Sequence, residues 1–251
     1  MYNIAKTLVI AVTLIMFASV ASVAVSEELI VGVGNWEPYY SRENESGIDM
    51  DLLKEAFTLL PQYTLTFKYM SVPRLLKDLE AGSIDVASMI TTGDTEVHLS
   101  IPFCRYTNVA ATLKKKNFVI NSMSDLKGMS IATFQGAQDV YGEEFRKVTE
   151  ANPGYKEYAK TAQMAKVVAL ERKDVYAADL YIFLHTITTE YKGSMTADDF
   201  AFSYLFDEVF FPVGFKDAAI RDEFNRAAEE IKANGAYEAV YEKYKSMLGL
   251  Q

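Results

Sequence analysis

Short apolar runs alternate along this chain with longer stretches in which apolar residues recur at helical spacing. Residues 29–33 form such an apolar run, and residues 63–69 alternate with the period of two that a half-buried strand shows. Residues 50–60 place Leu53, Ala56, Phe57 and Leu60 on one helical face. Residues 71–82 carry Leu75, Leu76 and Leu79 inward on a second helix, and residues 84–90 return as a strand. The order strand, helix, strand, helix, strand predicts a mostly parallel sheet with helices on its faces.

A second set of alternating elements follows the basic run at residues 114–116. The apolar patterns predict strands at 129–134 and 175–178 and helices at 137–148, 161–172 and 179–191, and two further apolar stretches lie at 200–206 and 209–215. Two helices close the chain, and the last one gathers Tyr237, Tyr241 and Tyr244 on one face, so it should dock on a core. Because no long Gly/Ser linker separates the two sets, we expect two α/β lobes joined by strands.

The first residues have the pattern of a cleaved secretory signal. Lys6 is followed by 14 uncharged, largely apolar residues at positions 7–20 and then by small residues up to Ser26. A membrane anchor is disfavoured, since such a run falls short of the roughly 20 residues that span a bilayer. We therefore expect a signal peptide at 1–26 and a periplasmic protein.

Charge and cysteine content exclude several classes of function. The net charge is -9, and because Lys6 would leave with the signal, the remaining chain would carry -10, which excludes a basic nucleic-acid footprint. Cys104 is the single cysteine, so an internal disulfide is excluded and a buried, inert thiol is expected. His98 and His185 are isolated, without metal-ligand spacing, and are expected on the surface. No metal or cofactor is predicted.

Six motifs, in order, resemble the extracellular solute-binding proteins of the polar-amino-acid type, which serve ABC importers. Each motif alone is weakly specific, and their common order carries the resemblance. The motifs are LIVGV at 29–33 with WEPY at 36–39, GIDMDL at 47–52, LEAGSIDV at 79–86, DLKG at 125–128, DVYAAD at 174–179, and NGAY with KY at 234–244.

The resemblance implies a type II periplasmic-binding fold, with two lobes that are each a mostly parallel sheet flanked by helices. The first lobe would comprise residues 27–112 and 207–251, and the second lobe residues 113–206. Two hinge strands, near residues 109–116 and 204–215, would join them. The ligand would lie between the lobes, at the carboxyl ends of the strands.

Three residues are candidate ligand contacts by position and chemistry. Trp36 and Tyr39 directly follow the first strand, and an indole face attracts a cation or stacks on a flat group. The alternative for Trp36 is packing within its loop. Asp179 matches the acid that, in amino-acid binders, takes the ammonium group of the ligand, and a carboxylate in a dry cleft suits that role. The alternative for Asp179 is an N-cap of the following helix, and the two roles are compatible.

The carboxylate-binding motif of the family is altered. Amino-acid binders carry Thr-x-Glu-Arg between positions 89 and 102, whereas this chain has Thr91 and Thr92 there and no Arg. After Gly136, the usual hydroxyl is replaced, which leaves Gln138 as a candidate contact, and Asp139 would compete with an anion for the helix N–H groups.

Arg74 and Arg105 are the candidate substitutes for the missing arginine. Arg74 lies in Val-Pro-Arg, near the position where looser relatives have Trp-x-Arg, and Arg105 lies close to the expected hinge. For both residues, a solvated or inter-lobe ion pair is an equal alternative.

We expect a receptor that closes on one small polar ligand, an amino acid, amine or related metabolite, for an ABC importer. One alternative is an exported dehydratase-like enzyme on the same fold, with Asp179 or Glu37 as its acid or base. Another is a sensing module for a membrane signalling protein. Because no nucleophile–base pair is visible, a non-enzyme is predicted. The expected partners are the ligand and a membrane permease or sensor, with the protein itself a monomer.

Overall fold

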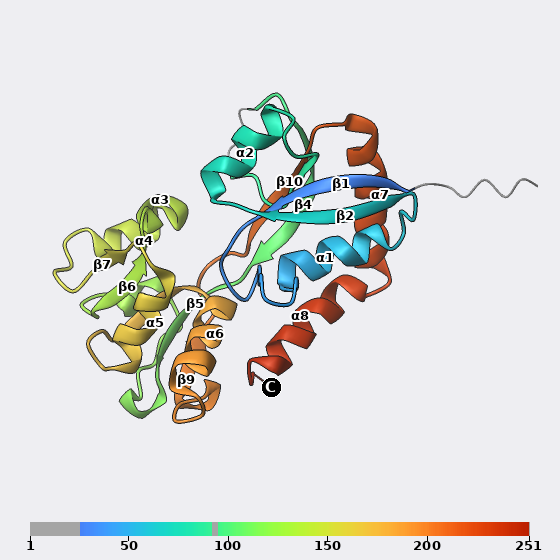
Figure 1. The fold of residues 1–251 in the computed structure, drawn as a ribbon. Coiled ribbons are helices and arrows are strands. Elements are labelled where there is room, and N and C mark those ends of the chain that lie inside the picture. Colours follow the sequence, from blue (N-terminus) through green and yellow to red (C-terminus); the bar gives the residue numbers. More distant parts are fainter. Residues whose placement is uncertain (1–25, 92–94, 251) are drawn as a thin grey trace, which may run out of the picture.

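The computed structural model describes residues 26–91 and 95–250, which form two lobes that are each built on one five-stranded sheet (Figure 1). The predicted two-lobed α/β fold is confirmed. The predicted signal peptide lies outside the described residues except for Ser26. In the described ranges, no helix is long and apolar enough to cross a membrane.

The first sheet has the strand order β2-β1-β3-β10-β4. Its strands are β1 (Glu27–Val33), β2 (Tyr63–Tyr69), β3 (Val86–Ala87), β4 (His98–Tyr106) and β10 (Val209–Phe215). β1 pairs in parallel with β2 and β3, whereas β10 is antiparallel to both β3 and β4. The sheet is therefore mixed rather than mostly parallel, because β10 enters it from the other lobe and runs against its neighbours.

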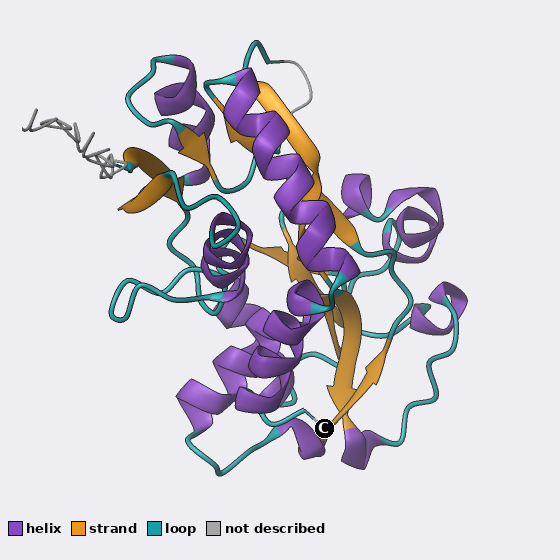
Figure 2. Cartoon of the chain, turned by 90° about the vertical axis from the view of Figure 1, so that its right-hand side faces the viewer, coloured by secondary structure: helices purple, strands orange, loops and turns teal. Residues whose placement is uncertain are grey.

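Four helices surround the first sheet. They are α1 (Ile48–Phe57), α2 (Val72–Glu80), α7 (Ala218–Ala233) and α8 (Ala236–Met247). Figure 2 shows the long helix α7 in front of the strands, and α1 packs against both α7 and α8. The prediction that the last helix docks on a core is confirmed, because Tyr237, Tyr241 and Tyr244 are buried.

The second sheet has the strand order β7-β6-β8-β5-β9. Its strands are β5 (Asn108–Leu113), β6 (Ile131–Phe134), β7 (Lys156–Tyr158), β8 (Val175–Asp179) and β9 (Phe200–Ser203). β6 pairs in parallel with β7 and β8, and β5 is antiparallel to β8 and β9. This sheet is mixed for the same reason, since β5 arrives from the first lobe.

Helices and short 3₁₀ turns complete the second lobe. They are α3 (Ala137–Val140), α4 (Gly142–Thr149), α5 (Thr161–Ala169), α6 (Leu180–Tyr191), η1 (Lys114–Lys116), η2 (Met123–Leu126) and η3 (Ala197–Asp199). The single helix predicted at 137–148 is broken into α3 and α4, because Gly142, where α4 begins, has a φ of 78°, which interrupts a continuous α-helical backbone. The strand predicted at 84–90 is reduced to β3, and the apolar stretch at 200–206 forms a strand only as far as Ser203.

The chain passes between the lobes at Thr107 and again between β9 and β10. The expected lobe boundary at residue 112 and the expected hinge at 109–116 are therefore wrong on the first crossing. All residues of β5 are buried, and they pair with β8 and β9, so this strand belongs wholly to the second sheet. The second expected boundary, between residues 206 and 207, falls within the second crossing.

Candidate functional site

A cleft of about 410 Å³ lies between the two sheets. This size falls within the range of roughly 300–1,000 Å³ that is usual for small-molecule sites. Three of its positions lie at or just beyond the carboxyl ends of parallel strands, β1, β6 and β8, as expected for α/β sheets. The cleft is lined by Trp36, Val72, Met89, Tyr106, Val209 and Phe211 from the first lobe and by Asn108, Phe134, Val140, Thr161, Tyr176, Ala178, Asp179 and Ile182 from the second.

Asp179 is the one charged residue among the described residues that line this cleft. It is the last residue of β8 and is only 5% exposed. Oδ1 accepts a hydrogen bond from the Ile182 amide at 2.9 Å, which shows the predicted N-cap of α6. Oδ2 accepts hydrogen bonds from the Tyr39 hydroxyl at 2.7 Å and the Thr107 amide at 3.1 Å. These three donors are neutral, so none of them supplies a positive charge to balance the carboxylate when it is ionised.

Burial sets the protonation of Asp179. It raises the pKa of this carboxyl to about 7, although the hydrogen bonds from Ile182, Tyr39 and Thr107 act in the opposite direction. A group of this kind responds strongly to any charge that enters the cleft, because a cation nearby favours the ionised form.

Trp36 lines the cleft, whereas Tyr39 lies behind it. The Tyr39 side chain is fully buried, stacks on Tyr106 with ring centroids 4.2 Å apart, and donates its hydroxyl to Asp179. Tyr39 therefore holds the carboxylate from the first lobe and is absent from the residues that line the cleft. The Trp36 indole packs edge-on against Tyr40 and donates its N–H to the Tyr106 hydroxyl at 3.3 Å.

A second buried carboxylate, Asp49, lies beneath this aromatic layer. Its Oδ2 accepts hydrogen bonds from the Tyr40 hydroxyl at 2.6 Å and the Tyr106 hydroxyl at 3.2 Å. Its Oδ1 has no hydrogen-bond partner among the described residues. Asp49 is completely buried, which raises its pKa to about 7. The chain of contacts from Asp49 through Tyr106 to Trp36 thus reaches the cleft surface.

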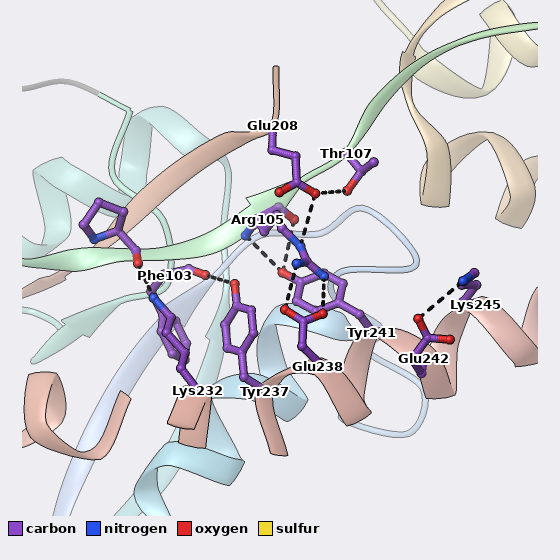
Figure 3. A network of polar contacts seen from close by, with 11 residues as sticks. Phe103, Arg105, Thr107, Glu208, Lys232, Tyr237, Glu238, Tyr241, Glu242 and Lys245 are labelled. Atoms are coloured by element: carbon purple, nitrogen blue, oxygen red, sulfur yellow. Dashed lines mark hydrogen bonds and ion pairs between the residues drawn. The ribbon is translucent and has the colours of Figure 1, made fainter. Parts of the chain in front are cut away.

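Arg105 lies outside the cleft, in a network that joins the strand crossing to α8 (Figure 3). Both of its terminal nitrogens donate to Glu238 at 2.9 Å, and its guanidinium lies 4.0 Å from the Tyr241 ring centroid. Glu208, at the other crossing, lies 3.6 Å from Arg105 Nε and accepts from the Thr107 hydroxyl at 3.2 Å. The predicted ligand role of Arg105 is not supported, because the side chain points to α8 and is paired there.

The remaining polar candidates are not brought into the cleft. Arg74 is 64% exposed along its side chain and pairs with Asp78 at 2.6 Å, one turn further along α2. Gln138 donates to the Thr149 hydroxyl at 3.0 Å, so it is used within the second lobe. Thr91 lines a separate hollow of about 280 Å³ beside the cleft. Thr92 lies outside the described residues.

Two side chains behave differently from their expected roles. Asp139 does not cap α3, because it forms an ion pair with Arg146 instead. His185 is half-buried at the lobe boundary rather than on the surface, and its Nε2 lies 3.2 Å from Oε2 of Glu37 in the other lobe. Burial lowers the pKa of His185, which favours the neutral imidazole, although the charge of Glu37 acts in the opposite direction. Cys104 is a buried free thiol, as predicted.

Sequence reasoning missed most of the cleft wall. Tyr106, Asn108, Phe134 and Phe211 come from strands or strand ends, where apolar residues are indistinguishable from core residues. A usable signal existed for Phe134 and Ala178, since each closes a predicted strand at the carboxyl end.

Comparisons with known proteins agree with this architecture. Residues 29–247 match the family described as bacterial extracellular solute-binding proteins, family 3. The L-cystine-binding protein TcyJ of Bacillus subtilis is 25% identical over 238 residues, which cover 87% of this chain and 84% of that protein.

Two solved structures show the same fold. An ancestral cationic amino acid solute-binding protein has a TM-score of 0.66 at 20% identity, covering 86% of this chain and 95% of that one. A histidine kinase sensor domain with similarity to periplasmic binding proteins has a TM-score of 0.63 at 13% identity, covering 88% and 96%.

Proposed function

We propose that this chain, which belongs to the bacterial extracellular solute-binding proteins of family 3, binds one small solute between its lobes and delivers it to a membrane importer. The observation that carries the proposal is the cleft between the two sheets, with the buried carboxylate of Asp179 in its wall. Cystine and amino-acid recognition in the named relatives supports a solute of similar size.

The geometry also supplies a way to couple binding to the arrangement of the lobes. Asp179 belongs to the second lobe, and it accepts hydrogen bonds from Tyr39 of the first lobe and from Thr107 at the crossing. A ligand that contacts Asp179 therefore acts on a residue that both lobes and the crossing hold. Closure around two short crossing segments would turn occupancy into a shape that a membrane partner recognises.

The proposal is tested by screening a metabolite library for thermal stabilisation. A ligand that binds the folded state alone must raise the Tm, by an amount that grows with its concentration over Kd. The intrinsic fluorescence of Trp36, the single tryptophan of the chain, gives a second readout from within the cleft. The Arg74→Ala variant, altered outside the cleft, should respond as the wild type does.

The outcome that contradicts the proposal is equally clear. If no library member shifts either the Tm or the Trp36 emission between pH 5 and pH 9, the cleft is not a solute site. The enzyme alternative predicts turnover of a bound compound by purified protein. The sensor alternative predicts ligand-dependent binding to a membrane kinase and no stimulation of uptake by a permease in proteoliposomes.

A further inference from the structure

We infer that the ligand is a small organic cation with an apolar body and no carboxylate, an inference that rests on the proposed function. The family relatives named above bind amino acids, which carry both charges. The described residues that line the cleft of this chain include a partner for the positive charge, Asp179, and no Lys or Arg for the negative one.

The charged residues that line the cleft and the hollows beside it are all acidic among the described residues. Two smaller hollows share walls with it, one through Val72 and Met89 and the other, of about 270 Å³, through Trp36, Thr161 and Ile182. Among the described residues that line these three hollows, none is Lys or Arg, and the acidic ones are Asp179, Glu37 and Glu190.

Neighbouring groups neutralise only one of these three acids. Glu190 pairs with Lys166 at 2.8 Å. Glu37 contacts the imidazole of His185, whose pKa is lowered by burial, and no Lys or Arg pairs with Glu37 among the described residues. Asp179 accepts only from neutral donors, as described above. A cationic ligand would supply the missing counter-charge to a buried carboxylate, which is costly to leave unpaired.

The remainder of the wall suits an apolar body that carries a cation. The rings of Trp36, Tyr106, Phe134 and Phe211 line the cleft together with aliphatic side chains. Aromatic faces attract ammonium groups, most strongly where water is excluded. The polar groups left for a neutral or anionic head are few, chiefly Asn108 and Thr161.

Among the described residues that line the cleft, no Lys or Arg is present to pair with a ligand carboxylate. The two arginines that could have held one are engaged elsewhere, Arg74 with Asp78 and Arg105 with Glu238. The first-turn amide of α6, at Ile182, already donates to Asp179. A carboxylate beside the ligand ammonium would also lie near the Asp179 charge, and like charges in a site of low dielectric repel.

The first experiment compares matched probes by titration calorimetry and Trp36 fluorescence. Each set has an amine, the amino acid that differs from it by an added carboxylate, and an acid without the amine, for example phenethylamine, phenylalanine and 3-phenylpropionate. We expect each bound amine to bind at least about tenfold more tightly than its amino acid, and the acid not to bind. Isopentylamine with leucine and tyramine with tyrosine extend the series.

The second experiment adds the missing cation. Val140 lines the cleft yet is 54% exposed, so Val140→Arg should fold and offer a carboxylate partner. We expect this variant to move the amine-to-amino-acid affinity ratio toward the amino acid by about tenfold. Leu170→Arg, at a residue that is 52% exposed and lies outside the cleft lining, is the matched control and should leave the ratio unchanged.

The outcomes separate this inference from the proposed function. The inference is overturned if an amino acid, or any other library compound with a carboxylate, binds as tightly as the best amine. The proposed function as a solute receptor is then still supported. A Val140→Arg variant with an unchanged ratio also counts against it. If neither the probes nor the library bind, the proposed function fails and the inference fails with it.

Discussion

Asp179 and Asp49 are two buried carboxyl groups with similar titration and different surroundings. Burial raises the pKa of each to about 7, and both accept a tyrosine hydroxyl. Asp179 ends a strand at the cleft, where two backbone amides also donate to it. Asp49 lies on α1 inside the first lobe, where the donors bonded to Oδ2 are tyrosine hydroxyls and Oδ1 has no partner among the described residues.

This difference separates a group that faces a ligand from one that positions other side chains. Asp179 lines the cleft, so its charge is available to a solute. Asp49 is absent from the lining, and it acts on the cleft only through the hydroxyl of Tyr106. Burial and a raised pKa alone therefore do not identify a binding group, and access to the cleft decides.

The largest effect is expected in the pH dependence of stability on removing Asp49. Its folded pKa of about 7 lies above the ordinary value of 3.8, so the folded state holds the proton more tightly. The contribution of this bound proton to the free energy of unfolding is fully present below pH 4 and is lost as the pH rises to 7. The window spans about three pH units at roughly 1.4 kcal/mol each, so the loss is about 4 kcal/mol. In urea unfolding, the free energy of unfolding of Asp49→Asn relative to that of the wild type should therefore rise by that amount between pH 4 and pH 7.

Asp198→Asn is the control for this measurement, because it removes the same charge from an exposed position. Its difference from the wild type should stay flat over the same pH range. A flat difference for Asp49→Asn as well would show that Asp49 does not titrate near neutrality.

The next effect is on binding. Asp179→Asn retains an N-cap for α6 but removes the charge, so amine affinity should fall about 100-fold, or roughly 2.7 kcal/mol. Asp49→Asn should change the Kd less than about threefold, because Asp49 does not line the cleft. Calorimetry at pH 8, where both carboxyls are ionised, measures the two variants. An equal loss of amine affinity in the two variants would contradict the assignment of Asp179, and not Asp49, as the group that contacts the ligand.

A smaller effect is expected at the link between Asp49 and the cleft. Tyr106→Phe keeps the ring but removes the hydroxyl that donates to Asp49 and accepts from the Trp36 indole. The unfolding free energy should fall by about 1 kcal/mol, and the Trp36 emission should shift. Tyr63→Phe, whose ring lies on β2 outside the cleft lining, is the control and should leave the Trp36 emission unchanged.

The smallest effect is expected at the two arginines once offered as ligand contacts. Arg74→Ala removes an exposed pair and should change stability by less than about 0.5 kcal/mol. Arg105→Lys loses a bidentate contact with Glu238 and should cost about 1 kcal/mol. Neither should alter the preference among ligands. If Arg105→Lys changes the preference among ligands, Arg105 takes part in ligand binding after all.

The sequence by itself determined the local elements and the class of fold. Apolar periodicity depends on neighbouring residues alone, so β1, β2 and α6 were predicted nearly to their ends. Asp179 was identified for the same local reason, since a strand directly precedes it and a helix follows. The ordered motifs indicated two lobes, and the family match agrees.

Only the tertiary structure decided where the lobes divide and which polar groups reach the cleft. β5 belongs to the second sheet because β8 and β9 pair with it, which its own apolar pattern cannot express. Arg105 was excluded from the cleft by α8, more than 130 residues further along the chain, whose Glu238 and Tyr241 hold it. Asp49 and Asp179 are alike in residue type and in burial. Their difference arises from long-range packing, which seals one carboxyl inside a lobe and leaves the other at the cleft.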